Sequence, residues 1–472
     1  MKYFSKCFKW TLLSGFLFYS HAWSSDTSFL RGENLGFEWV IPFVGLLLSI
    51  AFMPLFMPNL WHKHYGKIGA GWAILTSTLL AREVGLLTMF HSLAVTLVQH
   101  YIPFILMIGA LYVITGGIRL NIQAPSTPFS NTIILGAGTL LASVIGTTGS
   151  SMLFIQPFLL LNKERQVRRH LVIFFIILVC NVGGALSPIG DPPLLLGFLK
   201  GVPFFWPLMH LFMPFIVIFI PVLGLFYAVD RYQFMKEKRP LKPKATFKFS
   251  LQGYDNVLLL AGAILCLFIG EISFLKNSLN FFGMRVTFGD LVRDISLLGL
   301  AFASLKICQQ KSRFQNQFTW APLTEIIILF AAIFVTVEPV LTMLKAGDKG
   351  AFSGIYKVLT TAQGEPLTQG YFWLTGLLSS FLDNAPTYLI FFNLAGGDAQ
   401  SLTTALSPLL VATSAGAVFM GALTYIGNAP NFMVKSIAEA NSIEMPSFFH
   451  YTLLVSLILL PLFTVLSVLF FS

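Results

Sequence analysis

The chain contains one ten-residue motif twice. Residues 184–193 read GALSPIGDPP and residues 421–430 read GALTYIGNAP, 237 positions later, with six identical positions. Each copy interrupts a long apolar segment with glycine and proline, which end helices because proline lacks an amide donor and its ring clashes with the preceding turn. The motif therefore predicts two broken helices, one in each half of the chain.

The composition places these helices in a membrane. Hydrophobic residues make up 56% of the 472 residues and charged residues 11%, whereas a soluble domain averages about 25% charged residues. Since a membrane-spanning helix needs roughly 20 apolar residues, the chain has room for one polytopic bundle and no separate soluble domain. The net charge of +10 lies in short gaps between apolar spans, where it records membrane topology. We therefore expect the lipid bilayer, and no nucleic acid, as a partner.

Apolar runs predict the continuous spans. The first two, at about 39–58 and 68–81, are separated by a polar gap that contains His62 and Lys63. The others run at about 92–118, 204–228, 254–270, 291–306, 320–341 and 448–471.

Two further apolar stretches are interrupted in the middle. Residues 131–161 are broken by GTTGSS at 146–151, and residues 370–396 by DNAPT at 383–387. The arms of the first stretch are too short to cross a bilayer separately, and the second aligns with it at an offset of 236. The pattern predicts two re-entrant helical hairpins with tips that face the protein interior, because irregular backbone is not tolerated against lipid.

These elements divide the chain into four parts. Residues 1–22 have the basic, apolar and small-residue order of a signal peptide, with a short uncleaved first helix as the alternative. A first membrane repeat follows at 39–229, a basic cytoplasmic linker at 230–253 and a second repeat at 254–472. Lysine and arginine are more frequent in the loops that this topology assigns to the cytoplasm, and the two hairpins then enter from opposite sides.

The predicted fold is thus an all-α polytopic membrane protein. It has inverted-topology repeats with two re-entrant helical hairpins and two discontinuous helices, an architecture found in many secondary transporters. We expect it in the inner (cytoplasmic) membrane as a multi-pass protein.

Broken helices at membrane depth expose backbone amides, which attract anions, and carbonyls, which coordinate cations. Two hairpin tips and two breaks predict two related ion sites whose hydroxyl, amide and carboxylate oxygens suit Na⁺. The first site comprises Thr147, Thr148, Ser150, Ser151, Ser187 and Asp191. The second comprises Asp383, Asn384, Thr387, Thr424 and Asn428. Asn181 and Asn431 lie within reach of these sites in the prediction.

Asp191 and Asp383 are the only carboxylates in these elements. Burying a carboxylate inside a membrane costs free energy, so a carboxylate found there indicates a functional role. We therefore expect both to bind Na⁺ transiently. The alternative is that they, like the serines and threonines of the tips, only cap half-helices. Glu325 and Glu338 fall nearer to interfaces, where solvated or paired structural roles are expected.

The stretch NVGGALSPIGD at 181–191 resembles the Asn-x-Gly-Gly-x-x-Ser-Pro-x-Gly-Asp run of NhaD-type sodium/proton antiporters. Over residues 39–471 the architecture is similar to the ion transporter superfamily, which also contains arsenite exporters, citrate carriers and dicarboxylate symporters. The tips differ from the Ser-Asn-Thr of the dicarboxylate symporters, which argues against a dicarboxylate. The resemblance implies ion-binding roles for Asn181, Ser187, Asp191, Asp383 and Thr387.

The leading hypothesis is Na⁺/H⁺ antiport by alternating access, in which Na⁺ and H⁺ compete for the oxygens of Asp191 and Asp383. The first alternative is a Na⁺- or H⁺-coupled carrier of citrate or another carboxylate. The second is a passive channel or an anion exporter. The sequence contains no phosphate-binding loop, metal-binding histidine pair or nucleophile elbow, so we expect no cofactor and no enzyme. Stoichiometry, a homodimer, and rocking or elevator motion stay open.

Overall fold

The computed structural model describes residues 30–472 apart from 238–247, 273–274, 276, 282–283, 308–312, 314–317 and 362. The predicted signal peptide at 1–22 lies outside the described residues, as does the middle of the linker predicted at 230–253.

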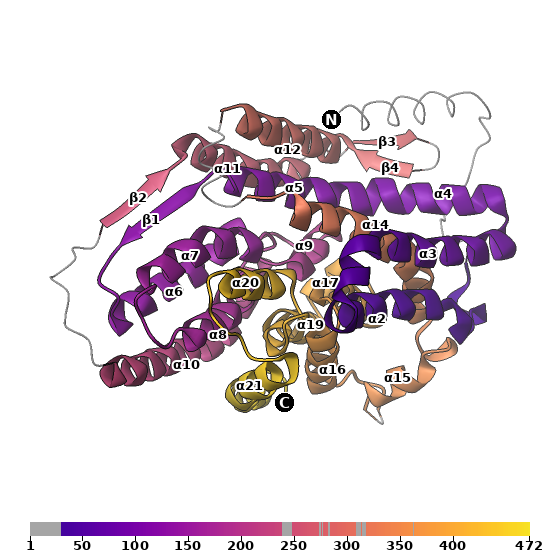
Figure 1. The fold of residues 1–472 in the computed structure, drawn as a ribbon. Coiled ribbons are helices and arrows are strands. Elements are labelled where there is room, and N and C mark those ends of the chain that lie inside the picture. The colour runs from indigo at the N-terminus through magenta and orange to yellow at the C-terminus, as the bar shows by residue number, and fades with distance from the viewer. Residues whose placement is uncertain are drawn as a thin grey trace.

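The first helices form a group at one side of the molecule (Figure 1). Two short 3-10 turns, η1 (Gly32–Asn34) and η2 (Phe37–Trp39), lead into α2 (Ile41–Phe56) and α3 (Pro58–Val84). The next rod is α4 (Leu86–Thr96), a π-helical turn η3 (Leu97–Tyr101) and α5 (Ile102–Thr115). The polar gap expected around His62 and Lys63 is helical and belongs to α3, because polar residues end an apolar run without breaking the helix.

Helices break where the sequence predicts. In the first half, α6 (Pro128–Ile145) and α7 (Thr147–Leu161) turn at Gly146, whose φ of +83° favours glycine. The first broken helix consists of α8 (Arg169–Leu178), the turn η4 (Val182–Gly184) and α9 (Pro192–Leu199).

The second half has the same order of elements. Helices α16 (Thr368–Phe381) and α17 (Asn384–Leu394) meet at residues 382–383. The second broken helix consists of α19 (Ser407–Met420), η8 (Gly421–Leu423) and α20 (Ala429–Ala440).

Longer helices surround these broken elements. They are α10 (Trp206–Lys236), α11 (Tyr254–Cys266) with η5 (Leu267–Glu271), α12 (Phe288–Ile307), α14 (Ala321–Lys345) and α21 (Phe448–Phe470). Short turns complete the described chain: η7 (Gly347–Lys349), α15 (Ser353–Val358) and α18 (Ala399–Thr403). Among the described residues, six helical segments are long and apolar enough to cross a membrane, which confirms a polytopic helical membrane protein.

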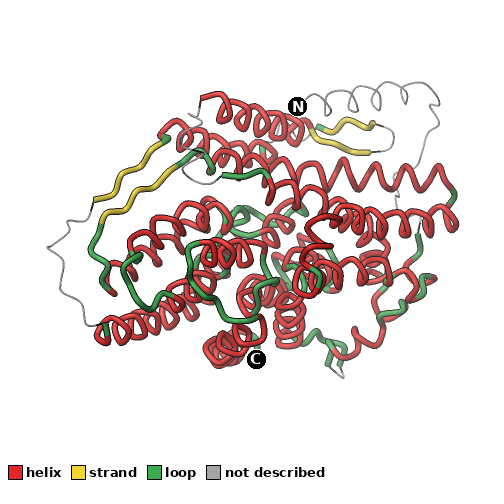
Figure 2. The backbone as a smooth tube through the Cα atoms, in the orientation of Figure 1, coloured by secondary structure: helices red, strands yellow, loops and turns green. Residues whose placement is uncertain are grey.

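Two small sheets are additions that the sequence analysis missed (Figure 2). Strand β1 (Arg119–Gln123) pairs antiparallel with β2 (Lys248–Gln252), and β3 (Ser278–Phe281) pairs with β4 (Met284–Thr287). Strand β2 falls within the stretch predicted as a linker. Four- and five-residue strands carry too little periodicity to stand out, and β1 finds its partner more than a hundred residues away.

The broken helices lie at the centre of the bundle. Every residue of α8 after Arg169 is buried, as expected of a helix that is apolar on all sides and enclosed by protein. In Figure 1, α9, α17 and α19 lie between α4 and α5 on one side and α10 and α21 on the other. The polar breaks are therefore held inside the protein, away from lipid.

Close packing of α16 against α19 generates a first prediction. A Cβ atom at Gly416 of α19 would lie 2.5 Å from the carbonyl oxygen of Phe372 in α16. We expect Gly416→Ala to force these helices apart and destabilise the purified protein by roughly 1–3 kcal/mol. Gly224→Ala is the matched control, because nothing lies within 4 Å of a Cβ at Gly224. Equal thermal denaturation midpoints for the two variants in detergent would contradict the packing.

Candidate functional site

One serine holds the first break against the first helical pair. The Ser187 hydroxyl donates to the carbonyl oxygen of Ser143 in α6 and accepts the amides of Ile189 and Gly190, each at 3.2 Å. The Ser143 hydroxyl in turn donates to the carbonyl oxygen of Gly183 at 2.5 Å. The break is thus pinned to α6 by hydroxyl groups on both chain segments.

The same four bonds recur 237 positions later. Thr424 donates to the carbonyl oxygen of Ser380 in α16 and accepts the amides of Ile426 at 3.2 Å and Gly427 at 3.1 Å. The Ser380 hydroxyl donates to the carbonyl oxygen of Met420 at 3.1 Å. In both halves, therefore, the hydroxyl group of the motif donates its hydrogen bond to a backbone carbonyl oxygen of the same half.

The Asp191 carboxylate joins the two halves. Its Oδ1 accepts the Thr147 hydroxyl at 3.0 Å and the Asn428 amide at 2.9 Å, and its Oδ2 accepts the Asn384 amide at 2.5 Å. Thr147 and Asn384 begin α7 and α17 and are 237 positions apart, while Asn428 is the counterpart of Asp191 in the repeated motif. Asp191 is only 1% exposed. The structure thus brings to one carboxylate three residues, Thr147, Asn384 and Asn428, that the sequence analysis divided between two sites.

The two aspartates differ in whether their side chains cap a helix. Asp191 precedes α9, but Pro192 and Pro193 occupy the first two helical positions without an N–H group, and the Asp191 side chain makes no capping bond. The Asp383 carboxylate does cap α17, because its Oδ1 accepts the amide of Ala385 at 3.2 Å. The capping alternative therefore describes Asp383, whereas the side chain of Asp191 is committed to groups from other elements.

A cavity of about 480 Å³ leads to this cluster. Helices α2, α3, α5 and α14 line one part of its wall, and α7, α9 and α20 line another. Apart from two tyrosines, its ionisable lining residues, among those that the structure describes, are three carboxylates and one histidine, with no lysine or arginine: Asp191, Asp383, Glu325 and His62. The rest of the lining is mainly apolar. The electrostatic character of the cavity favours a cation over an anion.

The remaining predicted residues lie around this cluster in different roles. Thr148 lines the cavity. Ser150 donates to the carbonyl oxygen of Gly138 at 2.6 Å, and the Ser151 hydroxyl lies 3.2 Å from the sulfur of Cys180. Thr387 donates to the backbone carbonyl oxygen of Asp383 at 3.0 Å. Ser150 and Ser151 thus contact groups of neighbouring chain segments, whereas Thr387 bonds to the N-cap residue of its own helix α17.

Two asparagines tie the broken helices together. The Asn181 amide donates to Asn431 Oδ1 at 2.8 Å, and the Asn431 amide donates to the carbonyl oxygens of Gly421 and Thr424 at 2.9 and 3.0 Å. Asn181 Oδ1 and Asn384 Oδ1 are buried acceptors without a hydrogen-bond partner among the described residues. Buried acceptors are seldom left unpaired, so each is a candidate cation ligand.

Comparison with known families indicates a transport protein. A family model described as "putative citrate transport" matches residues 32–471. The chain belongs to this family. No curated protein matches the chain. Membership of the citrate-transport family and the apolar helices together make the chain a multi-pass membrane transport protein, whereas both a cation antiporter and a citrate carrier are compatible with the match.

The cavity of this citrate-transport family member also contains groups that the sequence analysis did not place at a site. Glu325, expected to be solvated or paired near an interface, lines the cavity and accepts the indole N–H of Trp61 at 3.3 Å. Trp61 lies 264 positions earlier in the chain. Neither residue belongs to the repeated motif, and only the packing of α3 against α14 brings them to the cavity.

The bonds to Asp191 generate a second prediction. Asn384→Leu removes the donor to Oδ2 and leaves a buried carboxylate short of one partner, at a cost of roughly 1–3 kcal/mol. In an Asp191→Asn background the charge is absent, so we expect the same substitution to cost much less. A double-mutant cycle of denaturation midpoints measures this coupling. Additive effects of the two substitutions would contradict the bond.

Proposed function

We propose that the chain is a secondary active transporter that exchanges Na⁺ for H⁺ by alternating access. The observation that carries this proposal is the buried Asp191 carboxylate, reached by a cavity whose described lining has three carboxylates and no lysine or arginine. Asp191 is buried within the protein, yet it lines the cavity from which an ion can reach it. A carboxylate of this kind, where two half-helices meet, can bind and release small cations.

Competition at Asp191 provides the coupling. The carboxylate holds either a proton or Na⁺, and either one neutralises the same charge, so the two ions exclude each other. Asp383 adds negative charge to the cavity while it caps α17. Rotation of the Asn384 amide would turn its unpaired Oδ1 toward the ion and complete an oxygen-rich site.

In this proposal the two halves of the chain are inverted repeats with re-entrant hairpins, the architecture that supports alternating access in many transporters. It is supported by the hydrogen bonds that recur at an offset of 237 and by the breaks at corresponding places. Trp61 and Glu325 line the cavity near those ends of α3 and α14 that the predicted topology assigns to the cytoplasm. In this proposal the structure is an inward-open state of an inner-membrane transporter.

A Na⁺- or H⁺-coupled carrier of citrate or another carboxylate is the second candidate. The family description favours it, and the cavity is large enough for a small organic acid. In this mode the N-termini of the half-helices would hold the anion, although Pro192 and Pro193 leave α9 without amide donors at its first two positions. The negative charge of the lining carboxylates would repel an anion that enters the cavity without cations.

A transport assay tests the proposed function. We expect a pH gradient imposed across proteoliposomes to drive uptake of radioactive sodium, and Asp191→Asn to abolish it because an amide cannot exchange a proton for Na⁺. Asp398→Asn is the matched control, since Asp398 is exposed and caps only the short helix α18. Undiminished uptake by Asp191→Asn would contradict the carboxylate mechanism.

The same vesicles separate the other candidates. Accumulation of labelled citrate driven by a sodium or proton gradient would favour the carboxylate carrier. Flux that no gradient of either ion drives uphill would favour a passive channel or an anion exporter.

A further inference from the structure

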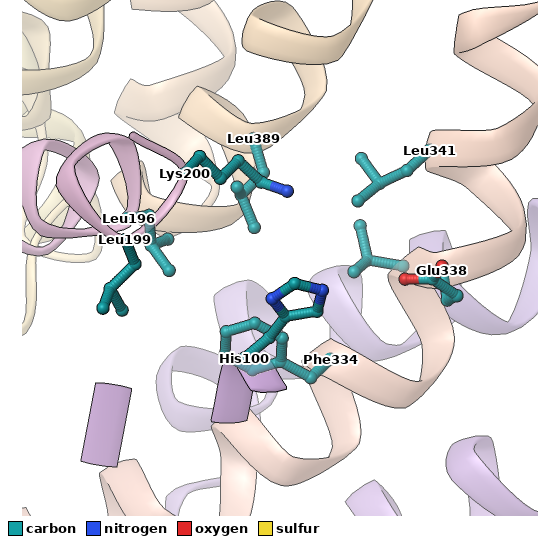
Figure 3. Close-up of a pocket in the computed structure, with 9 residues that line it drawn as sticks. His100, Leu196, Leu199, Lys200, Phe334, Glu338, Leu341 and Leu389 are labelled. Carbon is teal, nitrogen blue, oxygen red and sulfur yellow. The ribbon is translucent and has the colours of Figure 1, made fainter. Parts of the chain in front are cut away.

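A second, smaller cavity lies at the far end of α9 from Asp191 (Figure 3). Three ionisable side chains from three separate elements line it: His100 from the π-helical turn η3, Lys200 directly after α9, and Glu338 from α14. Its volume of about 20 Å³ is enough for a single water molecule. Figure 3 shows the His100 ring and the Lys200 ammonium directed toward the space between the elements.

The surroundings of these three groups are apolar. Leucine, phenylalanine and valine side chains form the rest of the lining, and α17 contributes Leu389. Among the residues that the structure describes, the side chains of His100, Lys200 and Glu338 are in no hydrogen bond or ion pair. All three are half-buried. Ionisable groups within a membrane protein, in apolar surroundings and without partners, are costly and indicate a functional role.

Lys200 is attached to α9, whereas the other charged groups of this cavity belong to η3 and α14. Lys200 follows the same half-helix that Asp191 precedes, and eight residues of helix separate them, or roughly 12 Å. His100 and Glu338 belong to η3 and α14, and Lys345 lies two turns farther along α14, close enough to act electrostatically on Lys200 and Glu338. A movement of α9 against α14 therefore changes the distance between the Lys200 ammonium and the Glu338 carboxylate.

We infer that His100, Lys200 and Glu338 form a second protonation site of this transporter, whose proton uptake depends on the position of α9. The inference rests on the proposed exchange of Na⁺ for H⁺. The Lys200 ammonium acts electrostatically on Glu338 without an ion pair, and a nearby positive charge favours the ionised carboxylate. When α9 moves away, Glu338 takes up a proton as a carboxylic acid; when α9 returns, Glu338 releases this proton through the cavity water or the His100 imidazole. Protons are thus exchanged on the side of Asp191 that faces away from the large cavity.

Two fluxes in proteoliposomes test this site. Exchange of labelled for unlabelled sodium at equal pH needs no net proton movement, whereas sodium uptake driven by a pH gradient does. We expect Glu338→Gln to retain the sodium-for-sodium exchange and to lower the pH-driven uptake by at least about tenfold, as expected for loss of a proton-transfer group. Glu365→Gln, an exposed carboxyl in the loop before α16, is the matched control and changes neither flux. A merely structural role of Glu338 would lower both fluxes together, and equal pH-driven uptake in wild type and Glu338→Gln would overturn the inference.

A spectroscopic measurement decides the inference independently of transport. Infrared difference spectra of the purified full chain between acid and alkaline pH report carboxylic acids by their C=O stretch. We expect Glu338→Gln to lose one component of this band and Lys200→Gln to shift the pH at which that component appears. A band unchanged in both variants would overturn the site, whereas failure of the wild type to take up sodium would overturn the proposed function alone.

Discussion

The structure depends on a single buried carboxylate that both halves of the chain must satisfy. Asp191 accepts hydrogen bonds from Thr147, Asn384 and Asn428, which belong to three different elements. A buried charge is expensive without such partners. Because the donors come from both halves of the chain, the charge couples the placement of one broken segment to the placement of the other.

Sequence symmetry explains how this arrangement arises. The hydroxyls of Ser187 and Thr424 make the same bonds in each half, so both breaks are built from one local design. The halves differ at the position held by Asp191 in one and Asn428 in the other. Two carboxylates at this meeting point would repel each other, whereas an aspartate and an asparagine form a bond of 2.9 Å. The difference between the two copies of the motif therefore determines which half of the chain supplies the carboxylate at this meeting point.

Much of the fold could be predicted because its signals are local. Glycine and proline reveal the breaks at Gly146 and at Pro192, and apolar runs reveal the long helices. The pairing of β1 with β2 depends on residues distant in sequence, and α3 continues through polar residues that end an apolar run without breaking the helix. The sequence analysis named the residues of the site. It did not predict that Asn384 and Asn428 both donate to Asp191. Glu325 and the cluster around Lys200 lie outside the repeated motif and have no sequence signal of comparable strength.

If one carboxylate binds either Na⁺ or a proton, sodium binding must release protons, and calorimetry measures this release. Sodium is titrated into the purified protein, at a pH where the site is protonated, in buffers that differ in ionisation enthalpy. The heat then reports the protons released per ion bound. We expect about one proton to be released for each Na⁺ that the wild type binds, because Na⁺ and H⁺ bind at the same carboxylate. We expect no proton-linked Na⁺ binding in Asp191→Asn. Sodium binding without proton release in the wild type, or unchanged linkage in Asp191→Asn, would contradict binding of both ions at one carboxylate.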